Sequence, residues 1–237
     1  MRAKDVSSFI EAIAPLESGI HGDENGFIFG DSDIEVSGVG VMWMPTAPAL
    51  SKAADERLNM LVVHEALFFV EQRSPWYNEP TTWAKLANRR RIKILLDNGM
   101  CVYRCHSNWD ACPKYGVVDS IAEKLGFVKE VARSRFGRVY EINPVSLEEF
   151  AETIRRRLDD LVVRFVGDPE VVITKVAPLV GGFGGNQFNM PEEASSMGAE
   201  AMILGDMVEY IAIHARELGL AVIETLHSAT ENPVFRT

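Results

Sequence analysis

The amino-acid sequence predicts an α/β fold: two intertwined α/β lobes with mostly parallel sheets and helices on the faces of each sheet. Apolar, strand-like runs alternate with amphipathic, helix-like segments through much of the 237-residue chain. The runs within 59–64 and 220–225 are almost continuously apolar, as in strands that are buried on both faces. The composition, 47% apolar and 24% charged, is that of an ordinary folded protein with a sizeable core.

Local signals mark where the predicted helices begin and end. Ser146-Leu147-Glu148-Glu149 has the spacing of a capping box, which opens a helix. Gly99, Gly126 and Gly219 each follow a helical pattern, where glycine readily adopts the left-handed conformation that closes a helix. The predicted helices cover residues 5–13, 48–57, 81–98, 117–125, 146–158, 191–197 and 208–218.

The predicted strands are the apolar or β-branched runs that lie between these helices. They cover residues 27–29, 36–44, 59–64, 100–104, 162–166, 172–180, 200–204 and 220–225. The segments 61–65 and 201–206 are alike, because each is a buried strand that ends in polar residues before a helix. We therefore expect one unit over 1–237 with two lobes of related layout, roughly 1–126 and 127–237. No linker rich in proline, glycine or serine separates them, so we expect them to be intertwined, with no inserted domain.

Charge and hydropathy limit the partners and the compartment. The net charge of −10 disfavours nucleic acid as a partner, and the basic run at 89–93 is interpreted as a solvated helix face. No apolar run approaches the roughly 20 residues that cross a bilayer, and the N-terminus lacks the apolar core of a signal peptide. Cys101, Cys105 and Cys112 are odd in number and form no disulfide framework. We therefore expect a cytoplasmic protein with no membrane partner.

Three short segments pair residue types that bind metal ions, and each follows a strand-like run. They are His64 with Glu65, His106 with Asp110, and His227 with Glu231. Ligands bind beyond the carboxyl ends of strands in open α/β sheets, so these side chains could meet at one sheet edge. Histidine nitrogen and carboxylate oxygen together suit two divalent ions, namely zinc, iron or manganese. The sequence therefore predicts a metal site, whereas each histidine taken alone would be read as a core or surface residue.

The spacing within the three pairs differs. His106 and Asp110 are four residues apart, as are His227 and Glu231, which places each pair on one face of a helical turn. His64 and Glu65 are adjacent and share a site only if the backbone turns sharply there; otherwise Glu65 caps the next turn. The glycine-rich run at 181–186 lacks the lysine of a phosphate loop and is interpreted as a tight turn that permits close backbone approach, with anion binding as the alternative.

Five motifs, in order along nearly the whole chain, resemble the Ngg-interacting factor three-like family, whose bacterial members are often labelled type 2 GTP cyclohydrolase I homologues. The similar stretches are Gly22-Asp23-Glu24-Asn25-Gly26 through Gly30-Asp31, Leu61-Val62-Val63-His64-Glu65-Ala66-Leu67-Phe68-Phe69, Tyr103-Arg104-Cys105-His106-Ser107-Asn108-Trp109-Asp110-Ala111, Gly198-Ala199-Glu200 through Gly205-Asp206, and His227-Ser228-Ala229-Thr230-Glu231. The resemblance implies a dinuclear metal centre in the cleft between the lobes, and a homo-oligomer in the form of a hexameric ring.

Carried over by resemblance, the metal ligands would be His64, His106, Asp110, His227 and Glu231. Glu65 replaces the family's second histidine, so it would be a harder ligand or a general base. The family's proline after this pair is Ala66 here, and its Lys-Tyr-His segment is replaced by Val208-Glu209-Tyr210. These departures put in doubt any function that needs that lysine or histidine.

Two functions are consistent with these residues. The first is a metal-dependent hydrolase or cyclohydrolase-like enzyme that acts on a nucleotide or another phosphate-bearing small molecule, with Asp110 or Glu231 bridging two ions. The second is a non-enzymatic ring scaffold that stores or senses metal, or regulates a partner protein. If Glu65 abolishes metal binding, the fold would serve as an interaction protein.

Overall fold

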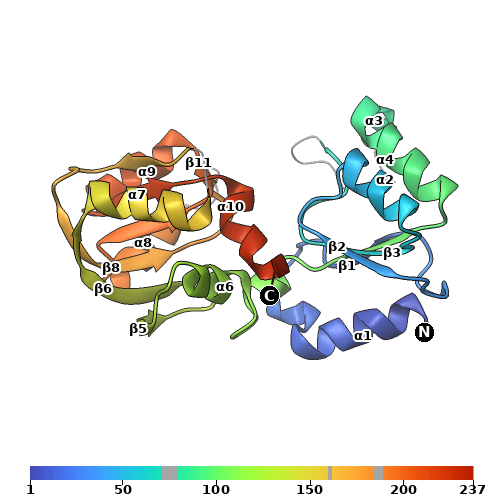
Figure 1. Ribbon diagram of the computed structural model, residues 1–237, viewed down its shortest axis with the longest axis horizontal. Coiled ribbons are helices and arrows are strands. Elements are labelled where there is room, and N and C mark those ends of the chain that lie inside the picture. The colour runs from blue at the N-terminus through green and yellow to red at the C-terminus, as the bar shows by residue number, and fades with distance from the viewer. Residues whose placement is uncertain (71–79, 160–161, 184–188, 237) are drawn as a thin grey trace. The chain divides into compact units, whose positions relative to one another are not determined.

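A computed structural model describes residues 1–70, 80–159, 162–183 and 189–236, and its chain divides into two compact units (Figure 1). The first unit is Met1–Cys112 and the second is Pro113–Thr237, so each is one continuous stretch of chain. This division lies before the lobe boundary expected near residue 126. The difference arises because helix α6, Val117–Lys124, contributes Ile121 and Ala122 to the core of the second unit.

The first unit contains a four-stranded sheet in which three neighbouring strands are parallel. Its strands are β1 (Gly26–Phe29), β2 (Val39–Met42), β3 (Met60–Val63) and β4 (Cys101–Arg104). Their order is β1-β4-β3-β2; β2, β3 and β4 run parallel, and β1 is antiparallel to β4. Every residue of β4 is buried, as expected for a central strand with a continuous apolar run.

Helices cover both faces of this sheet. They are α1 (Ala3–Ile13), α2 (Ala47–Asp55), α3 (Pro80–Ala84), α4 (Leu86–Asp97) and α5 (Ser107–Asp110), with a 3₁₀ turn, η1, at Leu16–Ser18. Figure 1 shows α2 and α4 on one face and α1 on the other. Leu50 of α2 and Leu95 of α4 pack on Leu61, whereas Ala3 of α1 packs on the face that carries Tyr103.

The single helix predicted over 81–98 was wrong, because two helices meet at Lys85. Lys85 has an extended backbone, with φ −64° and ψ 131°. The buried Asn88 amide holds this break: its Nδ2 donates to Thr82 O at 2.7 Å and to Phe69 O at 2.8 Å, and its Oδ1 accepts from Phe69 N–H at 2.9 Å. The helical pattern in the sequence carries no sign of these tertiary hydrogen bonds.

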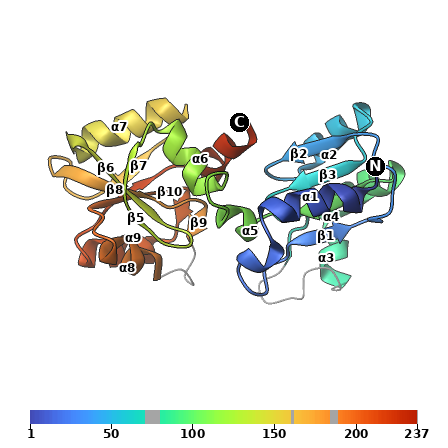
Figure 2. The same ribbon diagram turned by 90° about the horizontal axis from the view of Figure 1, so that it is seen from below.

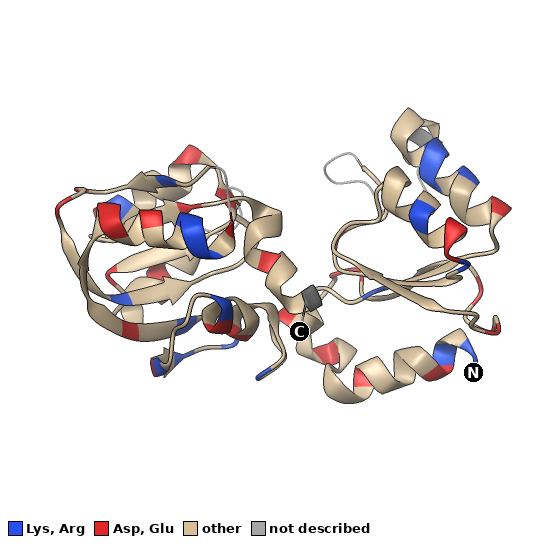
Figure 3. Ribbon diagram, in the orientation of Figure 1, with Lys and Arg blue, Asp and Glu red and all other residues tan. Residues whose placement is uncertain are grey.

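The basic run on α4 is a solvated face with one exception. Arg89, Arg90 and Lys93 are exposed, and Figure 3 shows the blue, positively charged segments of this helix. Arg91 is instead buried and donates from Nη1 to Leu67 O at 2.5 Å. The prediction of a solvated face is therefore confirmed for three of these four residues. Arg91 instead forms a buried hydrogen bond inside the first unit.

The second unit contains a six-stranded mixed sheet. Its strands are β5 (Lys129–Arg133), β6 (Arg138–Ser146), β7 (Arg164–Val166), β8 (Val172–Pro178), β10 (Ala201–Leu204) and β12 (Ala221–Glu224). Their order is β5-β6-β8-β10-β12-β7, with β8, β10 and β12 parallel and the outer pairs antiparallel. A separate parallel pair joins β9 (Gly182–Phe183) to β11 (Asp206–Met207).

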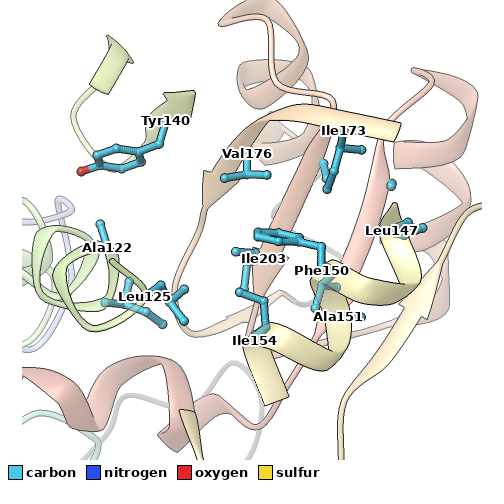
Figure 4. Packing of buried hydrophobic residues seen from close by; sticks show 14 residues of the cluster. Ala122, Leu125, Tyr140, Leu147, Phe150, Ala151, Ile154, Ile173, Val176 and Ile203 are labelled. Atoms are coloured by element: carbon cyan, nitrogen blue, oxygen red, sulfur yellow. The ribbon is translucent and has the colours of Figure 1, made fainter. Parts of the chain in front are cut away.

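Helices again cover both faces. They are α6, α7 (Leu147–Leu158), α8 (Asn189–Ser196), α9 (Glu209–Glu217) and α10 (His227–Glu231), followed by the 3₁₀ helix η2 (Asn232–Arg236). Figure 2 shows α6 and α7 on one face and α8 and α9 on the other. Figure 4 shows Phe150 and Ile154 of α7 facing the sheet residue Ile203. The predicted cap of α7 is confirmed, since the Ser146 side chain accepts from Glu149 N–H.

The hairpin formed by β5 and β6 escaped prediction. Residues 129–133 read Lys-Glu-Val-Ala-Arg and are mostly exposed, so this edge strand lacks an apolar run. An ion pair joins it to β6 instead: Lys129 Nζ lies 2.7 Å from Glu141 Oε1 on the opposite strand. An exposed edge strand gives a weak hydrophobic signal.

The two units share one order of elements when η1, α3, β9, β11 and η2 are left aside, together with the α6-β5-β6 segment that opens the second unit. The first runs α1-β1-β2-α2-β3-α4-β4-α5, and the second runs α7-β7-β8-α8-β10-α9-β12-α10. In both, three parallel strands follow in chain order, and the first strand lies antiparallel beside the last. The positions after β3 and β4 in the first unit therefore correspond to those after β10 and β12 in the second. This agrees with the related layout expected from segments 61–65 and 201–206.

Within the described residues, no helix is both long enough and apolar enough to cross a membrane.

Candidate metal centre

His64 lies directly after β3, and its ring is fixed by a backbone carbonyl. The side chain is 1% exposed, and its Nδ1 is 3.1 Å from Cys105 O. A carbonyl oxygen can only accept, so Nδ1 carries the proton and donates. When the ring is neutral, Nε2 carries its lone pair, and this nitrogen lies 3.6 Å from Asp110 Oδ1. That nitrogen is the atom of His64 that a metal ion would contact.

His106 follows β4, the strand beside β3, and its ring is fixed by a carboxylate. Its Nδ1 is 2.8 Å from Asp23 Oδ2. The rings of His64 and His106 are 4.8 Å apart between centroids. Glu65 completes this group, because one ligand atom from each of the three residues lies within 4.8 Å of the other two. The backbone turn needed for His64 and Glu65 to share a site is therefore present in the first unit.

A buried guanidinium and carboxylate lie behind these histidines. Arg104 is 3% exposed at its side chain, and its Nη1 lies 2.8 Å from Asp23 Oδ1. Burial alone would raise the pKa of Asp23, but hydrogen bonds from His106 and Ser107 and the charge of Arg104 hold it well below its usual range. Asp23 is therefore an ionised acceptor. Since its folded pKa is depressed, its contribution to stability is present at neutral pH and is lost only in strong acid.

The second unit carries His227 and Glu231 on α10, directly after β12. Nε2 of His227 is 3.1 Å from Glu231 Oε1, and Nδ1 is 2.9 Å from Asp206 Oδ1. The Glu231 side chain is 3% exposed, whereas that of Asp206 is 62% exposed. The predicted spacing of four residues thus places both α10 side chains on one face, and Asp206, the first residue of β11, joins them as a second acidic residue.

Three glycines let the backbone pass close to His227. A Cβ at Gly181 would lie 2.8 Å from Glu231 Oε1, and one at Gly182 would lie 2.9 Å from His227 Nδ1. At Gly205 it would lie 2.6 Å from His227 Cα. The interpretation of the glycine-rich run as a close-approach turn therefore agrees with the structure at Gly181 and Gly182. Its remainder, residues 184–186, lies outside the described residues.

Replacing Gly205 with alanine is expected to destabilise the second unit by about 1–3 kcal/mol, because the added methyl group meets backbone atoms on two sides. The second of these is Gly181 O, at 2.7 Å from the new Cβ. Urea unfolding followed by circular dichroism measures this loss. An unchanged unfolding midpoint would show that α10 can move away without cost.

The structure also shows which functional residues were missed. Asp23 and Asp206 both lie in motifs quoted for the family resemblance, but neither was assigned a contact with a histidine. Asp23 is 83 residues from His106 in sequence, so spacing could not pair them. Outside the two groups, His214 lies 2.8 Å from Glu192 Oε1, a partner that its sequence neighbours did not indicate.

No cysteine of the described residues belongs to a group of side chains that could hold a metal ion. Burial raises the pKa of Cys105 to about 12 and that of Cys101 to about 11. Cys105 contributes to the histidine group through its backbone carbonyl rather than its thiol. The donor set is therefore imidazole nitrogen and carboxylate oxygen, which suits zinc, iron or manganese.

Comparison with known proteins gives one consistent family. The model of the Duf34/NIF3 (NGG1p interacting factor 3) family matches residues 1–237. A protein of Methanocaldococcus jannaschii named GTP cyclohydrolase 1 type 2 homolog is 30% identical over 98% of this chain and 90% of its own length. A Clostridium perfringens protein of the same name is 28% identical over 99% of this chain and 88% of its own.

Solved structures show the same fold. Reduced HcgD from Methanocaldococcus jannaschii has a TM-score of 0.78 at 28% identity, and covers 100% of this chain and 91% of that one. The protein ybgI, described as of unknown function, has a TM-score of 0.82 at 25% identity, with the same coverage.

Proposed function

This chain belongs to the Duf34/NIF3 family. From that premise we propose that it binds two divalent metal ions and is a metal-dependent hydrolase. The ligands are His64, Glu65, His106 and Asp110 of the first unit and His227 and Glu231 of the second. The substrate class is a phosphate-bearing small molecule such as a nucleotide. The name of these two relatives, GTP cyclohydrolase 1 type 2 homolog, supports nucleotides as the first compounds to test.

The observation that carries this proposal is the state of the two histidine rings in the first unit. His64 and His106 each have Nδ1 committed to an oxygen acceptor, at 3.1 Å and 2.8 Å, which leaves Nε2 as the metal-facing atom of each. Metal-binding histidines in proteins are usually held in this way by an outer carbonyl or carboxylate. The donor set therefore fits a divalent ion.

The remaining ligands supply charge. Asp110 and Glu231 are the carboxylates placed four residues after a histidine, and each would supply oxygen ligands to a divalent ion. When bound, a pair of such ions lowers the pKa of a water molecule and stabilises negative charge on a phosphate group. Glu65 would complete the ligand set or, if it stays uncoordinated beside the ligands, would serve as a general base toward water.

A metal-storing or metal-sensing scaffold is the second candidate. It is favoured by the engagement of Asp23 and Arg104 in internal hydrogen bonds, which leaves these two charged groups committed to structure. Turnover of a phosphate-bearing substrate by the metal-loaded protein would support the enzyme over the scaffold.

Elemental analysis of the purified protein, after stripping and reloading with zinc, manganese or iron, tests the proposal. We expect about two ions per chain, as in two-metal hydrolases, and a clear loss in Asp110→Ala. The matched control is Asp97→Ala, since Asp97 is an exposed carboxylate of the same unit that pairs with Lys93 at 2.6 Å. No uptake of any of the three metals by the wild-type protein would overturn the metal proposal.

Replacing Glu65 with histidine is expected to move metal preference toward zinc. Imidazole suits zinc better than manganese, so the ratio of zinc to manganese affinity should rise by about tenfold or more. Competition titrations with a chromogenic chelator measure the ratio, with the exposed Glu56→His as the control. A ratio that stays at the wild-type value would mean that Glu65 is not a ligand.

A further inference from the structure

We propose that Asp23 is a positioning residue, which fixes the ring of His106 in the tautomer that presents Nε2 to a metal ion. Arg104 holds Asp23 in place and ties it to the backbone of His64. The role in metal binding rests on the proposed function, whereas the placement of the proton on His106 stands on geometry alone.

Both carboxylate oxygens of Asp23 accept hydrogen bonds. Oδ1 accepts from Arg104 Nη1 at 2.8 Å. Oδ2 accepts from Asn25 Nδ2 at 3.1 Å, from His106 Nδ1 at 2.8 Å, and from both the N–H and the hydroxyl of Ser107. The Ser107 N–H and the Asn25 amide nitrogen can only donate, so Oδ2 is an acceptor and Nδ1 of His106 is the donor. Nε2 is then the only nitrogen of the neutral ring with a free lone pair.

The ion pair of Arg104 and Asp23 connects the ends of two strands. Arg104, the last residue of β4, donates from Nε to His64 O at 3.0 Å and from Nη1 to Glu24 O at 3.0 Å. His64 follows the neighbouring parallel strand β3. One buried guanidinium thus links the backbone beside one histidine to the carboxylate that orients the other. Two candidate ligands from different strands are fixed by one ion pair.

The ring and the backbone of His106 are held by hydrogen bonds to different residues. The N–H of His106 donates to Asn25 Oδ1 at 2.8 Å, a hydrogen bond that involves no atom of Asp23. Removing the Asp23 charge therefore leaves an anchor for the backbone while it frees the ring to rotate or to carry its proton on Nε2. A ring with Nε2 protonated cannot bind a metal ion through that atom.

The tautomer can be measured on the intact, metal-free wild-type protein. The ¹⁵N chemical shifts of the His106 ring, assigned by their absence in His106→Ala, should show Nδ1 protonated and Nε2 bare at a pH where the ring is neutral. A neutral ring protonated on Nε2 would overturn the inference. This measurement needs neither metal nor a folded Asp23 variant.

The consequence for binding is measured with zinc and a competing chelator. Asp23→Asn, checked for folding by circular dichroism, should bind zinc about 10- to 100-fold more weakly, as is usual when an outer-shell partner is lost. The matched control is Asp33→Asn, an exposed carboxylate that pairs with Lys4 at 2.6 Å in the same unit and should bind like wild type. A folded Asp23→Asn with wild-type affinity would overturn the positioning role. If the wild-type protein binds no zinc, manganese or iron, the proposed function fails, and the ring tautomer alone decides this inference.

Discussion

Replacing His227 with alanine is expected to weaken zinc binding by more than the roughly 10- to 100-fold that follows the loss of an outer-shell partner. His227 contacts Asp206 through Nδ1 and Glu231 through Nε2, at 2.9 Å and 3.1 Å. The substitution removes the nitrogen ligand that we propose for the second unit and leaves the carboxylates of Asp206 and Glu231. Metal content and a chelator competition titration measure the result.

His214→Ala is the matched control for this prediction. His214 also belongs to the second unit and also lies beside a carboxylate, 2.8 Å from Glu192 Oε1, but it lies on α9, away from α10. We expect its zinc affinity to equal that of the wild-type protein. Equal losses in both variants would mean that the effect comes from destabilisation of the second unit rather than from a lost ligand.

Replacing Arg138 with methionine is expected to cost about 3 kcal/mol of unfolding free energy, because a buried charge pair loses one partner. Arg138 is 1% exposed. It contacts Asp119 Oδ2 at 3.2 Å and donates from Nη1 to Ser134 O at 2.8 Å and to Gly137 O at 2.9 Å. In the variant, the two carbonyl oxygens and the Asp119 carboxylate lose their hydrogen-bond donor.

Arg133→Met tests whether burial is the cause. Arg133 contacts the same carboxylate, Asp119, at 3.1 Å, but its side chain is 42% exposed. An exposed pair of this kind contributes at most about 1 kcal/mol. Urea unfolding followed by far-UV circular dichroism compares the two variants. Equal destabilisation by both would contradict the argument from burial.

The elements that the sequence predicts well are those set by local pattern. The strands at Met60–Val63 and Cys101–Arg104 follow from continuous apolar runs, and the start of α7 follows from its capping box at Ser146. The α/β class follows from the alternation of such runs. These features depend on residues within a few positions of each other, so a single sequence contains the signal.

The features that could not be predicted depend on residues far apart in the chain. The break at Lys85 is held by Asn88 contacts with Phe69, and the β5 strand is defined by its pairing with β6 rather than by its own apolar content. In the site, the six predicted ligands separate into four in the first unit and two in the second. The acidic partners Asp23 and Asp206 are identified only once the chain is folded, because neither lies near its histidine in sequence.

The repeated order of elements has a consequence for how this site can evolve. Two identical half-chains in a symmetric dimer would carry every substitution twice. In a single chain, the position after β3 holds His64 and Glu65 while the corresponding position after β10 holds Gly205 and Asp206. Each half can therefore accumulate its own changes under separate selection. A substitution at position 65 can then change the side chains at one strand end while Gly205 and Asp206 stay as they are.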